Sequence, residues 1–271
     1  MERSLGLMCG AGELPALMAS EARRQGWRIV AFAFAPDTGA AAHAARVVPS
    51  AIAEMAPVLA ALQEEKVSGV VFSGKFWMGD LLRVEAVDDT YREMARRGRE
   101  RLIDDNVKAV LLGTLGALGI ELLDQRPFLA AGLPGEAVLG ARTPTAEQWE
   151  DVRRGLAVAR ATADLSVGQT VVVRRGAVSA VEAIEGTTEA IRRGTTLSGP
   201  GAVVVKAVGR DHDFRFDVPT IGPETIDAAA KGGAAVVAFE AERVFVLERE
   251  LTARRADAAA IALVSTRGAS G

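Results

Sequence analysis

The first 74 residues alternate between short apolar runs and helical patterns. Residues 5–9, 27–34 and 69–72 are almost uninterrupted apolar runs, which are typical of strands buried on both faces of a sheet. Residues 14–25 and 53–65 instead have apolar positions at helical spacing. Strands that alternate with helices in this way predict a parallel sheet covered by helices. We therefore expect an α/β fold that begins with a Rossmann-like nucleotide-binding domain.

After residue 145 the pattern changes. A helical pattern over 146–163 precedes two strands rich in β-branched residues, at 170–174 and 177–184, joined by a hairpin signal at Arg175-Gly176. Further elements are predicted as strands at 202–208, 236–239 and 244–247, and as helices starting at 187–188 and spanning 224–231. This order of elements predicts a mixed α/β (α+β) C-terminal domain.

A stretch rich in proline and glycine separates the two halves. Residues 127–144 contain three prolines and three glycines, a composition typical of a linker. A chain of 271 residues has room for two domains. We place the N-terminal domain at residues 1–135 and the C-terminal domain at residues 136–271.

Charge and rare residue types narrow the classes of function. The 32 Lys and Arg residues nearly balance the 35 Asp and Glu residues, which argues against a dedicated nucleic-acid binder. One cysteine excludes an internal disulfide and a cysteine zinc site. Two histidines leave little room for a histidine metal site or a Ser-His-Asp triad. A bound metal would therefore need oxygen ligands, as Mg²⁺, Mn²⁺ and Ca²⁺ do.

The sequence shows no export signal and no membrane span. The first residues lack the apolar segment and cleavage site of a signal peptide. The longest apolar run, residues 109–120, is shorter than the roughly 20 residues that a spanning helix needs. We expect a cytoplasmic protein.

Two glycine-containing turns follow predicted strands of the N-terminal domain. Gly10 and Gly12 come between a strand and a helix, where backbone N–H groups can face a phosphate. The third glycine of the dinucleotide fingerprint is missing, so a nucleotide cradle and a structural turn are equally good interpretations. Ser73 and Gly74 end another predicted strand, at the edge where such folds bind ligands.

Acidic residues gather at two places in the C-terminal half. Glu182 and Glu185 precede Thr187 and Thr188, which resemble N-cap residues of a helix. The two acids need a bend at Gly186 to share a ligand, and a capped helix with two solvated acids is the slightly favoured alternative.

Residues 211–217 hold three aspartates, a histidine and an arginine. In an extended segment, Asp211, Asp213, Arg215 and Asp217 would share one face. Three acids so close together are electrostatically costly unless a cation or a partner occupies that face. The segment therefore indicates a divalent-metal site, with a solvated surface as the alternative.

Several longer motifs occur in one order along the chain: GAGELP (10–15), DD (104–105), QWED (148–151), GQTVVV (168–173), AVEAIEGT (180–187), VK (205–206) and RFDVPTIG (215–222). Together they resemble the magnesium-dependent UDP-2,3-diacylglucosamine pyrophosphatases of the LpxI type, which act in lipid A synthesis. The resemblance spans nearly the whole chain and is densest from residue 165 to 240.

The resemblance implies a substrate held between two domains and hydrolysis of UDP-2,3-diacylglucosamine to UMP and 2,3-diacylglucosamine 1-phosphate. The family's essential acid corresponds to Asp217, and the catalytic residues we expect are Asp217, Asp213, Glu182 and Glu185. We expect the metal, Mg²⁺ or Mn²⁺, to be bound by Asp217, Glu185 and Asp213. The expected substrate-binding residues are Gly10, Gly12, Ser73, Gly74, Gln169, Thr187, Thr188, Lys206 and Thr220.

The expected partners follow from the same resemblance. They are the UDP-linked acylated glucosamine, the inner face of the cytoplasmic membrane through a basic segment at residues 92–101, and a second copy of the chain in a homodimer; no nucleic acid is expected. The basic segment could equally be a solvated helix face.

The chain also departs from the family pattern. Thr188 stands where an aspartate is usual, Gly209 stands where a lysine is common, and Glu242 stands where a glycine is common. These departures leave a second hypothesis, that of a non-catalytic or altered-specificity binder of a nucleotide-diphospho-sugar or lipid.

Overall fold

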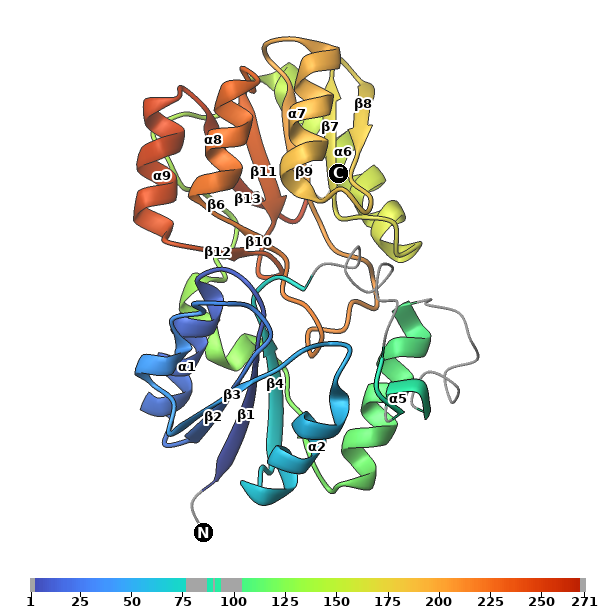
Figure 1. Ribbon diagram of the computed structural model, residues 1–271. Helices are drawn as coiled ribbons and strands as arrows, with labels where there is room; N and C mark the ends of the chain where they lie inside the picture. The colour runs from blue at the N-terminus through green and yellow to red at the C-terminus, as the bar shows by residue number, and fades with distance from the viewer. Residues whose placement is uncertain (1–2, 77–86, 90, 94–103, 269–271) are drawn as a thin grey trace. The chain divides into compact units, whose positions relative to one another are not determined.

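The computed structural model describes residues 3–76, 87–89, 91–93 and 104–268, with only the backbone of 104–107 (Figure 1). Most of the basic segment at 92–101 and the side chains of Asp104 and Asp105 lie outside this description. The chain divides into two compact units. Unit 1 comprises residues 1–129 and 213–217, and unit 2 comprises residues 130–212 and 218–271. Within the described residues, none of the helices has the length and apolar character needed to cross a membrane.

Unit 1 is built on a parallel sheet. Its strands follow the order β3-β2-β1-β4-β5. The strands are β1 (Ser4–Cys9), β2 (Arg28–Ala33), β3 (Arg46–Pro49), β4 (Gly69–Ser73) and β5 (Glu121–Leu122). The sequence did not predict β3, because this edge strand is mostly exposed and lacks a continuous apolar run.

Helices cover both faces of this sheet, as Figure 1 shows. They are α1 (Leu14–Arg24), α2 (Met55–Glu64) and α5 (Asp104–Ala117), with 3₁₀ turns η1 (Ala40–Ala42) and η2 (Arg126–Phe128). Val30, Phe32 and Val70 pack with Leu62 of α2 and Leu115 of α5 in one apolar cluster. The helix and strand patterns of the first 74 residues are thus confirmed at α1, α2, β1, β2 and β4.

Unit 2 contains a mixed sheet with the order β6-β13-β11-β9-β7-β8. Strands β9, β11 and β13 are parallel, whereas β7 runs antiparallel to β9 and β8, and β6 runs antiparallel to β13. The strands are β6 (Ala137–Val138), β7 (Thr170–Arg174), β8 (Ala177–Val181), β9 (Val203–Lys206), β11 (Val236–Glu240) and β13 (Ala262–Thr266). A separate parallel pair joins β10 (Thr220–Ile221) to β12 (Phe245–Val246). The α/β class, with a parallel sheet followed by a mixed sheet, is confirmed.

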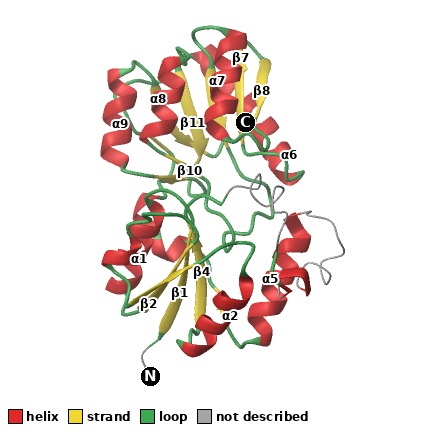
Figure 2. Cartoon of the chain, in the orientation of Figure 1, coloured by secondary structure: helices red, strands yellow, loops and turns green. Residues whose placement is uncertain are grey.

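Alternating side chains give the larger sheet two apolar faces. Val171, Val203 and Val205 belong to the cluster that contains α6 (Ala146–Asp164). Their neighbours Val172 and Val204 belong to the cluster on the opposite face. That face is covered by α7 (Thr187–Ser198), α8 (Pro223–Lys231) and α9 (Arg249–Ala258), which Figure 2 shows side by side. The sequence had not predicted α9 or β13.

The QWED motif serves the fold of unit 2. Thr145 caps α6 and forms a capping box with Gln148. One turn further along, both carboxylate oxygens of Asp151 accept the backbone N–H groups of Arg175 and Gly176, at 2.8 and 2.6 Å. Asp151 therefore holds the β7–β8 hairpin turn against α6.

The acidic segment at 211–217 was predicted to be extended, and this is wrong: it forms turns. The Phe216 N–H donates to the Asp213 carbonyl at 3.1 Å, and the Gln125 N–H donates to the Phe214 carbonyl at 3.1 Å. Phe214 is buried, and Phe216 packs against the core of unit 1. Burial of these two rings outweighs the strand alternation. Residues 213–217 therefore lie with unit 1, although the sequence had assigned them to the C-terminal domain.

Candidate functional site

In unit 1, the predicted ligand-binding loops follow two neighbouring strands, β1 and β4. The next strand after β1 lies on one side of it and β4 lies on the other, which makes this edge a topological switch point, where open α/β sheets bind ligands. The structure brings the two loops together. The Gly10 N–H donates to the Ser73 carbonyl at 2.8 Å, and Ala11 and Lys75 exchange backbone hydrogen bonds of 3.0 and 2.8 Å.

The glycines in these loops have different roles. A Cβ atom on Gly10 would lie 2.5 Å from the Lys75 carbonyl oxygen. Gly74 has a φ of +84°, and a Cβ atom there would lie 2.7 Å from the Ala11 carbonyl oxygen. Both glycines therefore allow the two loops to pack closely, as the structural-turn interpretation predicts. Gly12 instead has a φ of +96° with no atom within 4 Å of a Cβ position, so it leaves space beside the backbone.

Two further groups at this edge bear on ligand binding. The Ser73 hydroxyl is buried, with the residue 2% exposed, and has no hydrogen-bond partner among the residues that the structure describes. Helix α1 begins after Glu13 without a side-chain cap, so its first N–H groups are available to an anion. By contrast, burial raises the pKa of the nearby Cys9 thiol to about 12, which argues against a thiolate nucleophile at neutral pH.

Residues 213–217 reach unit 1 through their aromatic side chains. The Phe216 ring stacks on Phe72 with centroids 6.2 Å apart. The guanidinium of Arg126 lies 4.2 Å from the Phe214 ring centroid, and the Lys108 ammonium lies 5.7 Å from that of Phe216. These contacts fix the backbone on both sides of Arg215. Asp217, which follows Phe216, is exposed.

Asp213 forms an ion pair with its neighbour Arg215. The Asp213 carboxylate accepts hydrogen bonds from Arg215 Nε at 2.9 Å, from Nη2 at 2.7 Å and from the Arg215 backbone N–H at 3.0 Å. These bonds lower the pKa of Asp213 below its ordinary value. The carboxylate is thus already neutralised by a guanidinium in this conformation.

In unit 2, three predicted site residues form a hydrogen-bonded chain. Lys206 Nζ donates to Thr187 Oγ1 at 2.8 Å, and this hydroxyl donates to Glu182 Oε1 at 2.8 Å. Lys206 ends β9 and is 7% exposed. The structure therefore joins a buried ammonium to a carboxylate through one threonine hydroxyl. We call Glu182, Thr187 and Lys206 the relay cluster.

Strand pairing places two more groups beside the relay cluster. Thr170 lies opposite Lys206 in the β7–β9 pair, and its carbonyl accepts the Glu182 N–H at 2.8 Å. The Thr170 hydroxyl and Glu182 Oε2 are buried, and neither has a hydrogen-bond partner in the described part of the chain. Gln169 is also at this edge, because its carbonyl accepts the Ala207 N–H at 2.9 Å. Thr220 is in β10 and donates its hydroxyl to the Val218 carbonyl at 2.9 Å.

Helix α7 begins at the relay cluster in a way that the sequence did not predict. Thr187 and Thr188 were expected to be N-cap residues, but the N-cap is Gly186, with a φ of +83°. Thr187 is the first helical residue, and its hydroxyl serves the relay cluster. The helix therefore starts without a side-chain cap. Its first N–H groups and the Lys206 ammonium together make this end favourable for a phosphate.

Glu185 does not join the relay cluster. Its carboxylate accepts Arg193 Nη2 at 2.6 Å and the Ala183 N–H at 3.1 Å. The hydrogen bond from Arg193 lowers the pKa of Glu185 below its ordinary value. Glu185 therefore closes the turn before α7. Thr188 is exposed at the start of the same helix.

The described residues contain no group of three His, Cys, Asp or Glu side chains close enough to hold a metal ion. Of the predicted ligands, Asp213 is engaged by Arg215 and Glu185 by Arg193. Mg²⁺, however, is usually bound through one or two carboxylates together with substrate phosphates, without a cage of protein ligands. A magnesium site completed by substrate, with Asp217 as its carboxylate, fits the residues present.

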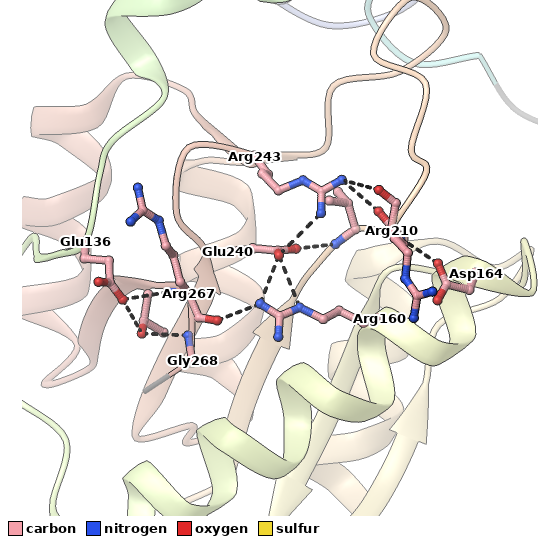
Figure 3. Close-up of polar contacts among 11 residues, drawn as sticks. Glu136, Arg160, Asp164, Arg210, Glu240, Arg243, Arg267 and Gly268 are labelled. Atoms are coloured by element: carbon pink, nitrogen blue, oxygen red, sulfur yellow. Dashed lines mark hydrogen bonds and ion pairs between the residues drawn. The ribbon is translucent and has the colours of Figure 1, made fainter. Parts of the chain in front are cut away.

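Sequence reasoning missed a buried charge network at the same edge of the unit 2 sheet. Glu240 ends β11 and contacts Arg160 and Arg243 (Figure 3). The sequence signal that could have found this network is Glu240 itself, an acid directly after four apolar strand residues, 236–239. Arg160 lies 80 residues before Glu240 and Arg243 lies three residues after it, so no local pattern predicts the contact with Arg160.

Comparisons with known proteins agree with the motifs. Family models described as the LpxI N-terminal domain and the LpxI C-terminal domain match residues 4–131 and 135–264. A protein of Caulobacter vibrioides named UDP-2,3-diacylglucosamine pyrophosphatase LpxI is 32% identical over 274 residues, which cover 94% of each chain.

Solved structures resemble the chain much more weakly. An ADP complex of N5-carboxyaminoimidazole ribonucleotide synthetase is 14% identical, with a TM-score of 0.28 over 63% of this chain and 37% of that chain. The Thermotoga maritima enzyme of the same name is 12% identical, with a TM-score of 0.25 over 66% and 41%. The chain thus spans less than half the length of these structures, and TM-scores this low carry no conclusion.

Proposed function

Because this chain belongs to the LpxI family, we propose that it hydrolyses the pyrophosphate bond of UDP-2,3-diacylglucosamine, giving UMP and 2,3-diacylglucosamine 1-phosphate for lipid A biosynthesis. The named relative is similar over 94% of both chains. Within this chain, the two family-model matches cover residues 4–131 and 135–264.

The observation that carries the proposal is the relay cluster. A diphosphate needs a fixed positive charge, and the Lys206 ammonium is fixed because it donates to Thr187 Oγ1. Thr187 in turn is held by Glu182, at the uncapped start of α7. We assign phosphate binding to Lys206 and to the first N–H groups of α7. As the P–O bond breaks, the same groups stabilise the negative charge that develops on the phosphate oxygens.

We assign nucleotide binding to the switch point of unit 1. Gly12 leaves open space beside the backbone, and the Ser73 hydroxyl has no partner within the described residues. The uncapped first turn of α1 adds N–H donors. The close packing of Gly10 and Gly74 shapes these loops without contacting the nucleotide.

We assign the attacking water to Asp217. Its carboxylate accepts a proton from the water while the water oxygen forms a bond to phosphorus and the bond to the bridging oxygen breaks. Asp213 and Glu185 were also expected to be catalytic. Their arginine partners favour positioning roles for both, Asp213 for the segment that carries Asp217 and Glu185 for the start of α7.

We also propose that the reaction requires a divalent cation, Mg²⁺ or Mn²⁺, which would neutralise charge on the diphosphate. Asp217 is the protein ligand that we assign, with substrate phosphates as the others. Peripheral contact with the membrane and a homodimer stay predictions.

The alternative is a binder that does not turn the substrate over. Thr188 favours it, because a neutral side chain stands at the start of α7 where the family pattern usually has an aspartate. Such a protein would keep the relay cluster, bind the UDP-lipid and release no UMP.

One assay distinguishes these two functions. Purified protein is incubated with UDP-2,3-diacylglucosamine, with magnesium or with EDTA, and UMP release is followed for wild type, Asp217→Asn and Asp213→Asn. We expect UMP release that EDTA stops and that Asp217→Asn lowers by roughly 10²- to 10⁴-fold, with a smaller effect of Asp213→Asn. Folded wild-type protein that binds the substrate without releasing UMP would instead establish the alternative.

A further inference from the structure

We propose that Glu240 is a positioning residue: through Val208 and Arg243 it holds residues 208–210, which lead through two further residues into residues 213–217 and Asp217. This proposal rests on the proposed function, because Asp217 is the residue whose backbone is being positioned. Glu240 itself touches neither substrate nor reacting atoms.

Both carboxylate oxygens of Glu240 are engaged. Glu240 is 5% exposed at the end of β11. Its Oε2 accepts the Val208 N–H at 3.0 Å. Its Oε1 accepts Arg160 Nε at 3.2 Å and Nη2 at 3.0 Å, and lies 3.5 Å from Arg243 Nη1. A carboxylate that is removed from water and paired with two guanidiniums has one fixed orientation. Its hydrogen bond to the Val208 N–H therefore fixes the backbone of Val208.

Arg243 extends the hold to the next two residues (Figure 3). Its Nη2 donates to the Gly209 carbonyl at 2.8 Å and to the Arg210 carbonyl at 3.3 Å. The Arg210 N–H donates to Asp164 Oδ1 at 2.6 Å. Three successive residues that belong to no helix or strand are thus fixed through their backbone groups by charged side chains.

Arg160 fixes the network from the opposite side. It donates through Nη2 to the Arg267 carbonyl at 2.7 Å as well as to Glu240. The Arg267 N–H donates to Glu136 at 2.8 Å. Glu240 is therefore attached to the end of β13 as well as to β11. The network is therefore anchored at the ends of two sheet strands, and it holds residues 208–210, which belong to no helix or strand.

A purely stabilising ion pair would not need this geometry. It would require only that Glu240 and an arginine neutralise each other, and burial of such a pair contributes little net stability. Here Glu240 Oε2 and Arg243 Nη2 form hydrogen bonds with backbone groups of residues 208–210. The shared target of these bonds is the segment that precedes the catalytic aspartate.

Two variants test the proposal. Glu240→Gln removes the charge that holds Arg243 and weakens the bond to Val208. Arg243→Ala keeps the buried Glu240–Arg160 pair, removes the 3.5 Å contact between Arg243 and Glu240, and frees the carbonyls of Gly209 and Arg210, so it tests the hold even if Glu240→Gln does not fold. Asp227→Asn is the control, because it breaks the Asp227–Arg255 ion pair between α8 and α9 in the same unit.

Hydrogen exchange, measured by mass spectrometry, and steady-state kinetics are the readouts. We expect faster exchange confined to residues 207–217 in Arg243→Ala, and also in Glu240→Gln where that variant folds. We also expect kcat to fall roughly 10- to 100-fold and KM to change less than twofold. The Asp227→Asn control should leave both readouts unchanged.

Unchanged exchange at 207–217 in Arg243→Ala would overturn the proposal, as would faster exchange throughout β9 and β11 or an increased KM with an unchanged kcat. Exchange requires no turnover. An inactive wild type would therefore refute the proposed function and, with it, the role of Glu240 in catalysis. Hydrogen exchange would still show whether Arg243 holds the segment.

Discussion

The carboxyl ends of the two sheets are built differently. In unit 1, the loops after β1 and β4 are joined by backbone hydrogen bonds, and Gly10 and Gly74 permit the close approach. In unit 2, the same edge of the sheet holds the buried charged side chains of Lys206 and Glu240 and the half-buried carboxylate of Glu182. The first edge is shaped by the main chain and the second by side-chain charge.

The difference indicates what each edge can contribute to a reaction. Backbone loops with small residues provide shape, and a ligand can contact them closely. Buried charges that are fixed by hydrogen bonds provide electrostatic stabilisation without reorganisation during the reaction. We therefore expect substitutions at the unit 2 edge to affect turnover, and substitutions at the unit 1 loops to affect mainly stability.

The largest effect is expected for Thr187→Val. This substitution keeps the shape of the side chain but removes the hydroxyl that accepts from Lys206 and donates to Glu182. We expect a loss of about 3 kcal/mol in the free energy of unfolding, because a buried ammonium and a half-buried carboxylate lose a partner. We also expect a fall of roughly 10²-fold in kcat/KM. Urea unfolding and the UMP-release assay measure the two quantities.

Thr188→Val is the matched control, because Thr188 is the next residue of α7 and is exposed. Its free energy of unfolding should stay within about 0.5 kcal/mol of wild type. Equal effects of the two substitutions would show that the relay cluster has no special role.

The next effect is expected for Gly10→Ala. The added Cβ would lie 2.5 Å from the Lys75 carbonyl oxygen, so the loops must separate. We expect a loss of about 2 kcal/mol in the free energy of unfolding. Gly113→Ala in α5 is the control with the opposite sign, because nothing lies within 4 Å of its Cβ position. It should stabilise the protein by up to about 1 kcal/mol. A Gly10→Ala protein as stable as wild type would contradict the packing role.

The smallest effect is expected for the Asp213–Arg215 pair. Arg215 lowers the pKa of Asp213 below the ordinary 3.8, so the folded protein keeps this carboxylate charged at a lower pH than the unfolded chain does. The resulting stabilisation is complete above the unfolded value and is lost as the pH falls through the folded pKa. Because the pair is partly exposed, we expect at most about 1 kcal/mol.

Urea unfolding of wild type and Asp213→Asn at several pH values tests this dependence. The difference in the free energy of unfolding should be constant between pH 6 and 8 and should shrink below the ordinary pKa of 3.8. A difference that grows as the pH falls would mean that another group stabilises this turn.

The sequence by itself determined the class of the fold and most of its elements. Continuous apolar runs predict buried strands because each side of such a strand needs an apolar neighbour, and β1, β2, β4, β7 and β9 follow that rule. The shared motifs also identified Glu182, Thr187 and Lys206, which the structure joins into one cluster. The local pattern was sufficient to predict an element wherever the side chains of that segment alone determine which of its faces are buried.

Only the tertiary structure decided the rest. Strand alternation put Asp211, Asp213 and Asp217 on one face, but burial of Phe214 and Phe216 turned the segment and assigned residues 213–217 to unit 1. The left-handed backbone of Glu242, with a φ of +63°, likewise becomes apparent only once the turn after β11 is known. The partners of Glu240 lie 80 residues before it and three residues after it. Contacts between distant residues depend on how the strands and helices pack, and no local pattern encodes that packing.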